Sequence, residues 1–331
     1  FRHLSLIELA RDQVRFEGER VEGLSRMEIA SRALHTTSDF PNILLAVANK
    51  RLRPAYEQSP STYRLWARRG PNAPDFKQIN VMQLGSAPAL EKVGENGEFK
   101  YGTIKEGTTS YSIVTYGKII GVTRQTIIND DLRALDRLPA AFGAAAARLE
   151  NMLVYMQLTT NPNMSDGVAL FHTATHGNLA SSGGAIADGT LAAGRAAMRG
   201  QKDIDGQTVL NLAPAFLITG AVNEQDAYKW TSPLYTPAKP GDVNEFRAGG
   251  RTALTPIIDG TLDGLTGAKH WFLAADPMQI DTVEYCYLDG EEGPHLESRI
   301  GFEIDGVELK ARLDFVAKVI DYRGLYKNPH A

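Results

Sequence analysis

The sequence predicts a protein of about two domains that mixes helices and strands, of the α/β or α+β class. The chain has 331 residues, and a domain usually holds about 150 residues. An alanine-rich segment at residues 132–158 has the composition of a long helix, whereas short strand and helix patterns alternate after residue 165. Hydrophobic residues make up 43% of the chain and charged residues 22%, which is ordinary for a folded protein and excludes wholesale disorder.

Charge and cysteine content exclude further classes of protein. The net charge of −4 argues against a dedicated nucleic-acid binder, which is usually strongly basic. No apolar run approaches the roughly 20 residues that a membrane helix needs. The single cysteine, Cys286, cannot form an internal disulfide and fits the reducing cytoplasm. The chain begins at Phe1 rather than methionine, which either proteolytic maturation or the omission of a preceding segment would explain.

Residues 1–39 carry a broken amphipathic pattern in which every basic residue is an arginine. Ser25 and Glu28 have the spacing of a capping box, which predicts a short helix through Leu34. The rigid arginine fork suits bidentate pairing with carboxylates of a neighbouring chain, although a solvated helical face explains the same pattern more simply. The candidates for contacts between chains in this segment are Arg2, Arg11, Arg15, Arg20, Arg26 and Arg32.

The next segments predict a core-facing helix and a protruding hairpin. Asp39 is a suitable N-cap, and the apolar stripe that follows predicts a helix that ends before Pro54. Residues 85–111 are rich in glycine and charge and poor in large apolar residues, so we expect a β-hairpin that extends roughly 40 Å from the body. Its candidates for contacts between chains are Glu91, Lys92, Lys100 and Lys105.

The rest of the chain predicts alternating elements. We expect a strand at 111–120, a long helix at 132–158, helices at 190–198 and 222–230, and strands at 211–219, 271–275 and 283–288. Residues 302–309 have the pattern of a hairpin whose two-residue turn is Asp305–Gly306, because this dipeptide tolerates positive φ. The alternation from Leu309 to Val319 predicts one long, half-exposed strand.

A search for catalytic and binding motifs yields no firm site. The phosphate-binding GxxxxGK[ST] and GxGxxG motifs and the hydrolase motif GxSxG are missing. Cys286 lies in a predicted strand, where a buried, inert thiol is expected rather than a nucleophile. The carboxylate pairs Asp130–Asp131 and Glu291–Glu292 are explained by helix capping and solvation.

The most enzyme-like feature is the pair His172 and His176. Two histidines four residues apart share one face of a helix, as zinc ligands can. However, the general-base glutamate of HExxH is missing, and Gly177–Asn178 is typical of a turn. We therefore expect a turn whose imidazoles hydrogen-bond to the backbone, and no catalytic, cofactor-binding or metal-binding residue is assigned.

In several stretches the chain resembles the major capsid proteins of tailed bacteriophages, specifically the Mu-like prophage major head subunit group. Members of this group are often encoded fused to, or beside, a prohead protease. The stretches are HLSLIELAR at 3–11, TSDFPNIL at 37–44, LGSAPALE at 84–91, IINDDL at 127–132, LFH at 170–172, HGNL at 176–179, FLAADP at 272–277, DTVEY at 281–285 and DYRGLYKN at 321–328. As a set they span nearly the whole chain.

The resemblance implies an α+β protein with the tailed-phage major capsid fold, often called the HK-ninety-seven type. Residues 1–39 would then be an N-terminal arm and residues 85–111 the extended E-loop. Residues 40–84 and 112–165 would form the peripheral domain, with its spine helix at 132–158. Residues 166–292 would form the axial domain, and residues 293–331 would be C-terminal strands that return to these domains.

The same resemblance implies a structural protein rather than an enzyme. Copies of the chain would assemble as hexamers and pentamers into an icosahedral shell in the bacterial host cytoplasm, and the shell would become the virion capsid around double-stranded DNA that it does not bind specifically. The implied partners are a prohead protease and scaffold, the portal and decoration proteins, with no membrane. Removal of an N-terminal segment by the protease would explain Phe1. Some relatives cross-link their shells through a Lys–Asn bond. Lys92, Lys100 or Lys105 could supply the lysine, but the pair of residues is not matched here, so non-covalent locking is expected.

Three alternatives remain at this point. An encapsulin-like or gene-transfer-agent compartment would use a related fold. A metal-dependent enzyme would use His172 and His176. A DNA-binding head-completion protein would need a basic face, which the sequence does not show.

Overall fold

A computed structural model describes residues 6–16, 18–35, 39–84, 106–123, 132–234, 246–267, 269–301 and 306–330. The chain divides into two compact units, each assembled from three separate segments. The first unit comprises Phe1–Ser61, Ile113–Glu150 and Tyr287–Phe315, and the second comprises Thr62–Ser112, Asn151–Cys286 and Val316–Ala331.

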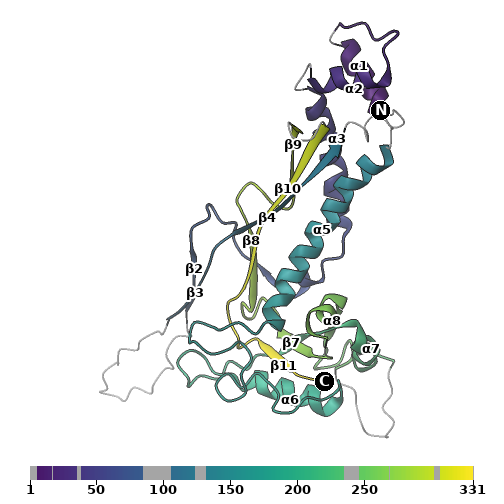
Figure 1. The fold of residues 1–331 in the computed structure, drawn as a ribbon. Helices are drawn as coiled ribbons and strands as arrows, with labels where there is room; N and C mark the ends of the chain where they lie inside the picture. The colour runs from purple at the N-terminus through teal and green to yellow at the C-terminus, as the bar shows by residue number, and fades with distance from the viewer. Residues whose placement is uncertain are drawn as a thin grey trace, which may run out of the picture. The chain divides into compact units, whose positions relative to one another are not determined.

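The first unit contains a three-stranded antiparallel arrangement and several helices (Figure 1). Strand β10 (Gly306–Val319) pairs with β4 (Val114–Thr123) on one side and with β9 (His295–Gly301) on the other. The helices are α1 (Leu6–Phe16), α2 (Arg26–His35), α3 (Asp39–Gln58) and the first part of α5 (Leu132–Thr159). A small apolar cluster joins α3 and α5 to β9 and β10, and consists of Leu45, Ala48, Leu52, Phe142, Leu296 and Ala311.

The second unit is built on a mixed sheet of four strands in the order β11–β7–β5–β6. These strands are β5 (Pro214–Thr219), β6 (Thr255–Ile258), β7 (Trp271–Ala275) and β11 (Leu325–Asn328). The unit also holds β1 (Arg68–Arg69), which pairs in parallel with β8 (Val283–Tyr287), and the two-stranded β2 (Ile79–Leu84) and β3 (Glu106–Tyr111). Its helices are η1 (Thr62–Leu65), α6 (Asp188–Arg199), η2 (Ala221–Asn223), α7 (Glu224–Thr231) and α8 (Gly260–Thr266).

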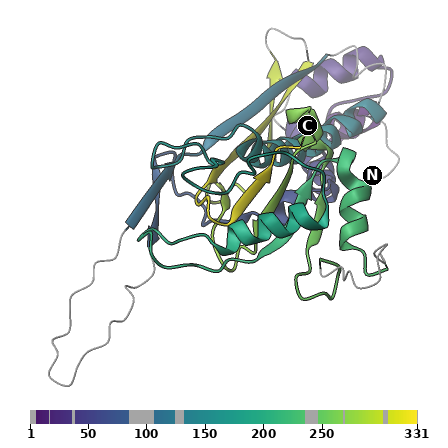
Figure 2. The same ribbon diagram turned by 90° about the horizontal axis from the view of Figure 1, so that it is seen from below.

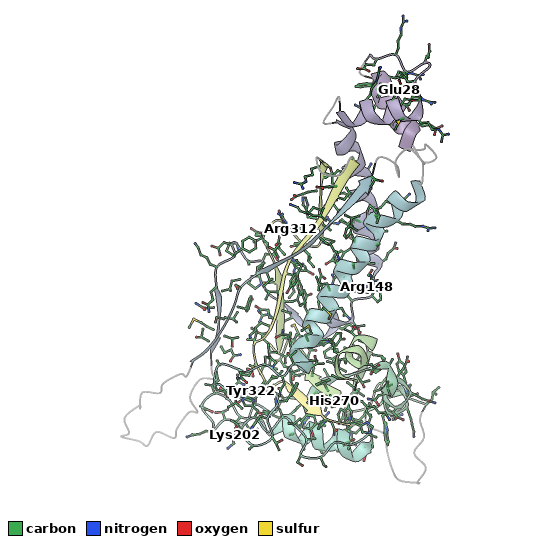
Figure 3. All side chains as sticks on the ribbon, in the orientation of Figure 1. Glu28, Arg148, Lys202, His270, Arg312 and Tyr322 are labelled. Carbon is green, nitrogen blue, oxygen red and sulfur yellow. The ribbon has the colours of Figure 1, made fainter. Side chains whose placement is uncertain are left out.

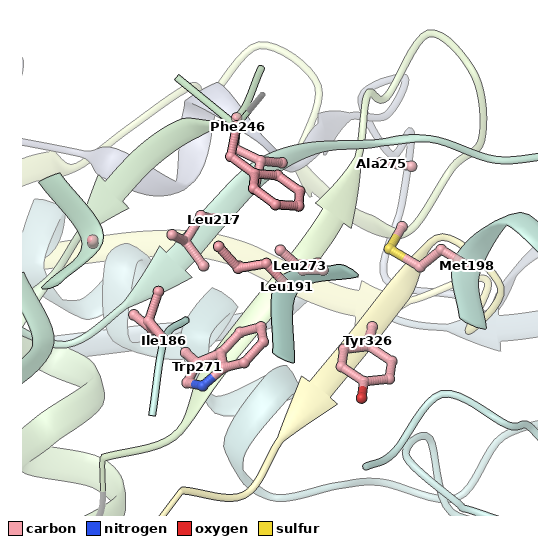
Figure 4. Close-up of a cluster of buried hydrophobic side chains, with 11 residues drawn as sticks. Ile186, Leu191, Met198, Leu217, Phe246, Trp271, Leu273, Ala275 and Tyr326 are labelled. Carbon is pink, nitrogen blue, oxygen red and sulfur yellow. The ribbon is translucent and has the colours of Figure 1, made fainter. Parts of the chain in front are cut away.

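The core of the second unit lies between the four-stranded sheet and α6, which runs beside β11 in both views (Figures 1 and 2). Leu191 and Met198 of α6 pack with Leu273 and Tyr326 of the sheet, together with Trp271 (Figure 4). Gly194 makes this contact possible, because a Cβ at that position would lie 2.8 Å from the side chains of Leu273 and Tyr326. The missing side chain at Gly194 lets the backbone of α6 approach the sheet closely at this position.

Several sequence expectations are confirmed at the level of elements. The long helix expected at 132–158 is α5, the strand expected at 271–275 is β7, and the strand expected at 283–288 is β8. The helices expected at 190–198 and 222–230 are α6 and α7, with α7 preceded by η2. The strand expected at 211–219 is shorter, as β5. The strand expected at 111–120 is divided between the end of β3 and β4.

The expected end of the helix before Pro54 is wrong, because α3 continues through Pro54 to Gln58. Proline removes one backbone hydrogen bond from a helix, so the last turn needs support from elsewhere. The Tyr56 hydroxyl supplies it by donating to the Glu150 carboxylate of α5 at 2.8 Å. At Gly143 the α5 backbone also lies against α3, since a Cβ there would be 2.5 Å from the Leu52 carbonyl oxygen. Packing against α5 outweighs the local cost of proline.

The expected Asp305–Gly306 turn is also wrong. Gly306 is the first residue of β10 and pairs with Gly301, so the two strands leave residues 302–305 between them. These four residues lie outside the described part of the chain. The observed register sets Arg299 opposite Glu308 and Glu297 opposite Lys310, and both pairs form salt bridges. Opposite charges facing each other across strands favour this register over the one that the dipeptide predicts.

The protruding hairpin expected at 85–111 is described only at its base. Residues 85–105 lie outside the described part of the chain. The strands on either side, β2 and β3, pair antiparallel from Leu84 and Glu106 down to Ile79 and Tyr111. This register is what two arms of one hairpin require where they enter the body.

Candidate assembly surfaces and buried polar clusters

The N-terminal helices α1 and α2 place most of the candidate arginines on the surface. The capping box forms as expected, since the Ser25 backbone N–H donates to the Glu28 carboxylate at 2.8 Å and the Glu28 N–H donates to the Ser25 hydroxyl at 3.3 Å. The resulting contacts lower the pKa of Glu28, which lies on α2 (Figure 3). Arg32 forms an ion pair with Glu19 of its own chain at 2.9 Å. The exposed candidates in this segment are Arg11, Arg15, Arg20, Arg26 and Arg32.

The remaining contact candidates cannot be placed. Arg2, Glu91, Lys92, Lys100 and Lys105 lie outside the described part of the chain. At the base of the hairpin, the Gln83 side-chain amide of β2 donates to the carbonyl of Ile320, which follows β10. The base is therefore fixed to the C-terminal segment of the second unit.

The two histidines form the turn that the sequence predicts. The Nδ1 atom of His172 accepts a hydrogen bond from the Thr175 N–H at 3.0 Å. His176 is buried, with Nδ1 3.0 Å from the Leu170 carbonyl oxygen and Nε2 2.8 Å from the Asp166 carboxylate. Burial opposes ionisation of Asp166, but the hydrogen bond to His176 prevails and lowers the pKa of this carboxyl.

This geometry argues against His172 and His176 as a pair of metal ligands. Both ring nitrogens of His176 are engaged, and its ring stacks on Tyr322 with a centroid separation of 3.7 Å. In the described segments, no group of three or more His, Cys, Asp or Glu side chains could hold a metal ion. The cavity beside His176, of about 560 Å³, is also lined by Asp166, Asp203 and Arg323. Asp166 is paired with His176, and Asp203 is paired with Arg323, so these side chains are not arranged around a nucleophile.

A buried ion cluster holds the C-terminal segment in the second unit. Arg323 donates from Nε to both carboxylate oxygens of Asp321 at 3.0 Å and forms a second ion pair with Asp203. All three side chains are buried. Burial alone would lower the pKa of Arg323, but the hydrogen bonds with the two carboxylates raise it. Nothing in the sequence indicates this cluster, although Asp321 and Arg323 lie in the DYRGLYKN stretch.

Lys327 in the same segment packs against aromatic rings. Its ammonium lies 5.8 Å from the ring centres of Phe171 and Phe272, and burial lowers its pKa. The Asn178 carbonyl accepts the Lys327 backbone N–H at 2.8 Å. The stretches around 170–179 and 321–328, which are separate in sequence, thus form one packed region.

The first unit has its own buried polar contacts. Glu150 of α5 accepts hydrogen bonds from the hydroxyls of Tyr56 and Tyr287 at 2.8 and 3.2 Å. Burial raises the pKa of Tyr56 well above its usual range, so this phenol stays a donor. On β10, Arg312 forms ion pairs with Glu291 and with Glu297, the latter at 3.6 Å. The unit is thus held together by charged and polar pairs as well as by apolar packing.

Cys286 has the environment that the sequence predicts for an inert thiol. It is fully buried in β8. Burial raises the pKa of its thiol, which reduces the fraction of reactive thiolate.

Of the helices in the described segments, none is long and apolar enough to cross a membrane.

Comparison with known proteins identifies the family. The family model described as phage capsid protein matches residues 105–328, about two thirds of the chain. Similar solved structures include those titled Microbacterium phage Oxtober96, with 13% identity, coverage of 83% of this chain and 92% of that chain, and a TM-score of 0.54. Mycobacterium phage Cain has 14% identity, 82% and 89% coverage and a TM-score of 0.52. Mycobacterium phage Adephagia has 15% identity, 82% and 88% coverage and a TM-score of 0.51.

At these identities the likeness to solved structures concerns the fold. No curated protein matches the chain in sequence. The family model spans β3 to β11. It includes Glu150, Tyr287 and the Arg312 ion pairs of the first unit, and the packed C-terminal region of the second. The chain therefore belongs to the phage capsid protein family and has the α+β fold of the tailed-phage major capsid proteins.

Proposed function

We propose that this major capsid protein assembles as hexamers and pentamers into an icosahedral shell that encloses double-stranded DNA. The match of residues 105–328 to the phage capsid protein family carries the proposal. Head-to-tail contacts between identical copies close into rings when the rotation between copies permits, and the same contacts can tile a shell. A structural role also agrees with the engaged state of His176 and the burial of Cys286.

The parts of the chain are proposed to divide this work. Residues 1–39 serve as an arm and residues 85–111 as the E-loop. Residues 40–84 and 112–165 form the peripheral domain, with α5 as its spine helix, and residues 166–292 form the axial domain. Residues 293–331 return to these domains as strands. The second compact unit includes residues 166–286 of the proposed axial segment, together with residues 62–84 and 151–165 of the proposed peripheral domain.

The candidate arginines and lysines are proposed to contact neighbouring copies. Arg11, Arg15, Arg20 and Arg26 are exposed on the N-terminal segment, where they can reach carboxylates of another subunit. Arg2, Glu91, Lys92, Lys100 and Lys105 carry the same proposal from the sequence alone, and Arg32 carries it in addition to its ion pair with Glu19. Contacts of this kind fix the register between subunits more than they add affinity.

Maturation and partners follow from the proposed Mu-like subgroup. A prohead protease removes an N-terminal segment, and scaffold, portal and decoration proteins act with the shell during assembly in the host cytoplasm. The net charge of −4 agrees with a shell protein that does not bind the enclosed DNA tightly, because strong phosphate binding requires clustered positive charge.

Electron microscopy of the purified protein tests the proposed assembly. We expect closed shells built of rings, and a protein that stays monomeric under all assembly conditions would contradict the proposal. Deletion of residues 94–105 should leave the circular dichroism spectrum of the subunit unchanged but prevent stable shells, because the proposed E-loop could no longer reach its neighbour. Normal shells from this variant would reject the role of the hairpin.

A further inference from the structure

We propose that α1 of one copy inserts Phe16 into an apolar groove of a second copy, formed by β4, α5 and β10. The inference rests on the proposed function, because it names one contact through which copies of a shell protein would meet. It concerns two sites of the first unit, the exposed face of α1 and the groove, each of which is incomplete in the isolated chain.

The groove has the size and lining of a site for one large side chain. Its volume is about 280 Å³, and its lining includes Tyr116 of β4, Phe142, Ala145 and Leu149 of α5, and Leu313 of β10. Pockets for cofactors and drug-sized ligands are larger, roughly 300–1,000 Å³, and carry several convergent polar groups. Ala145 is exposed, so its small side chain leaves the space above it open. The groove is lined mainly by apolar side chains and is close to the lower end of this size range, which suits one aromatic ring.

Phe16 is a suitable occupant because the described part of the chain leaves it exposed. Its exposed fraction is 88%, although phenylalanine is a residue that folded proteins normally bury. The opposite face of α1 is buried through Ala10 and Val14. Phe16 therefore lies on the face of α1 opposite to the one that packs on the rest of the first unit. A partner that covers this ring gains the hydrophobic free energy that the isolated chain does not realise.

The stripe of α1 that carries Phe16 and the rim of the groove have opposite charges, although Arg11 and Arg15 are also exposed on α1. Glu8, Asp12 and Phe16 are exposed and follow one another at intervals of four residues, so they form one stripe along α1. The groove is bordered by the cations Lys118 and Arg312. Lys118 is exposed, whereas Arg312 is engaged with Glu291. An aromatic ring preceded by two carboxylates thus matches an apolar groove with an exposed lysine at its rim.

A second copy is the partner that this arrangement favours. Every copy carries both Phe16 and the groove, so the contact is head-to-tail and can repeat from copy to copy around a ring. A foreign partner would need to present the same combination of an aromatic ring and carboxylates, which the shell protein already displays on α1.

Two pairs of variants test the contact. Phe16→Asp should lower the fraction of assembled protein at least about tenfold, because buried aromatic residues are frequent hot spots of interfaces. Met27→Asp on α2 is the matched control, since Met27 is also apolar and exposed, and it should assemble normally. Ala145→Trp should fill the groove and reduce assembly to a similar degree. Ala141→Trp, one turn earlier on the exposed face of α5, should have little effect.

Photo-crosslinking identifies the occupant directly. Benzoylphenylalanine in place of Phe16 keeps an aromatic ring, and assembly together with isotope-labelled wild-type copies distinguishes contacts between copies from contacts within one. We expect labelled peptides from 114–123, 132–159 or 306–319 to be captured. Capture of any other segment, or no capture in assembled particles, would overturn the proposal. Normal assembly of the Phe16→Asp variant would do the same.

The outcomes separate this inference from the proposed function. If wild-type protein forms shells and the Phe16→Asp variant forms them equally well, the contact is wrong and the shell function stands. If the wild-type protein forms no shells, the proposed function itself fails. Circular dichroism of each variant shows whether the subunit still folds, and Phe16 and Ala145 are exposed, so loss of folding is not expected.

Discussion

At the residue scale, the strongest constraint is a guanidinium buried between two carboxylates. Arg323 pairs with Asp321 and with Asp203, which lies 120 residues earlier in the chain. A buried pair adds little net stability compared with apolar packing, but removing one partner leaves uncompensated charge in a medium of low dielectric constant. The intact cluster therefore adds little to the free energy of unfolding, but the folded state requires that all three charged partners be present.

The substitution Arg323→Met makes this condition measurable. It leaves two buried carboxylates near each other without a cation, and we expect the free energy of unfolding of the second unit to fall by about 3–5 kcal/mol. Urea denaturation of dissociated subunits, followed by fluorescence, measures the change. Arg247→Met is the control, because Arg247 is exposed in the same unit and its loss should cost less than about 0.5 kcal/mol. A loss below about 1 kcal/mol for Arg323→Met would show that the cluster is hydrated or replaceable.

Some residue environments could be predicted from the sequence and others could not. The roles of His172, His176 and Cys286 could be predicted, because turn residues and strand patterns around them are local signals. The pairing of Arg323 with Asp203 could not, since nothing near either residue indicates burial. Phe16 could not be recognised as exposed either, because the periodicity of α1 gives no account of which apolar residue the fold leaves in solvent.

At the element scale, tertiary contacts overrule two local signals. Pro54 should end α3, and Asp305–Gly306 should form a tight turn, yet the helix continues and Gly306 enters β10. In both places the competing contacts are specific: a tyrosine–glutamate hydrogen bond for α3, and facing charges for the hairpin. Long segments with strong periodicity, such as α5, could be predicted because their own pattern suffices.

Three short elements, β6, β11 and α8, could not be predicted, for a related reason. The four-residue β11 and β6 are strands because β7 and β5 pair with them. The seven-residue α8 begins at Gly260, and the side chain of the preceding Asp259 accepts the Thr261 N–H and caps the helix. Segments of this length carry too few apolar residues to show a period, so their structure is decided by their neighbours.

The register of β9 and β10 gives the element-scale prediction. If Gly306 is a strand residue, the substitution Gly306→Val should be neutral or slightly stabilising, because valine favours extended backbone. If Gly306 stood in a two-residue turn that requires positive φ, the same change would cost roughly 1–2 kcal/mol or more. Thermal denaturation of the variant subunit distinguishes the two. A clear drop in melting temperature would support the two-residue turn at Asp305–Gly306 and contradict the observed register.

At the scale of the whole molecule, the free chain and the assembled chain should differ in stability. Each unit has buried apolar side chains of its own, so each can fold in the subunit. Phe16 and Leu234 are exposed apolar side chains of the described residues, and under the proposed assembly such side chains gain burial from other copies. Assembly binds the native state and not the unfolded chain, so it stabilises the native state by mass action.

Calorimetry of shells and of dissociated subunits measures this difference. Stabilisation by a partner present at about 100 times its dissociation constant amounts to about 2.7 kcal/mol. For a chain of this size it corresponds to a rise of about 4 °C in melting temperature. We expect shells to melt higher than subunits by at least this amount. The Phe16→Asp variant should leave the melting temperature of the subunit unchanged, because Phe16 contributes no buried area there. Equal melting temperatures for shells and subunits would mean that burial between copies adds nothing to the stability of the chain, and that each subunit realises its full stability alone.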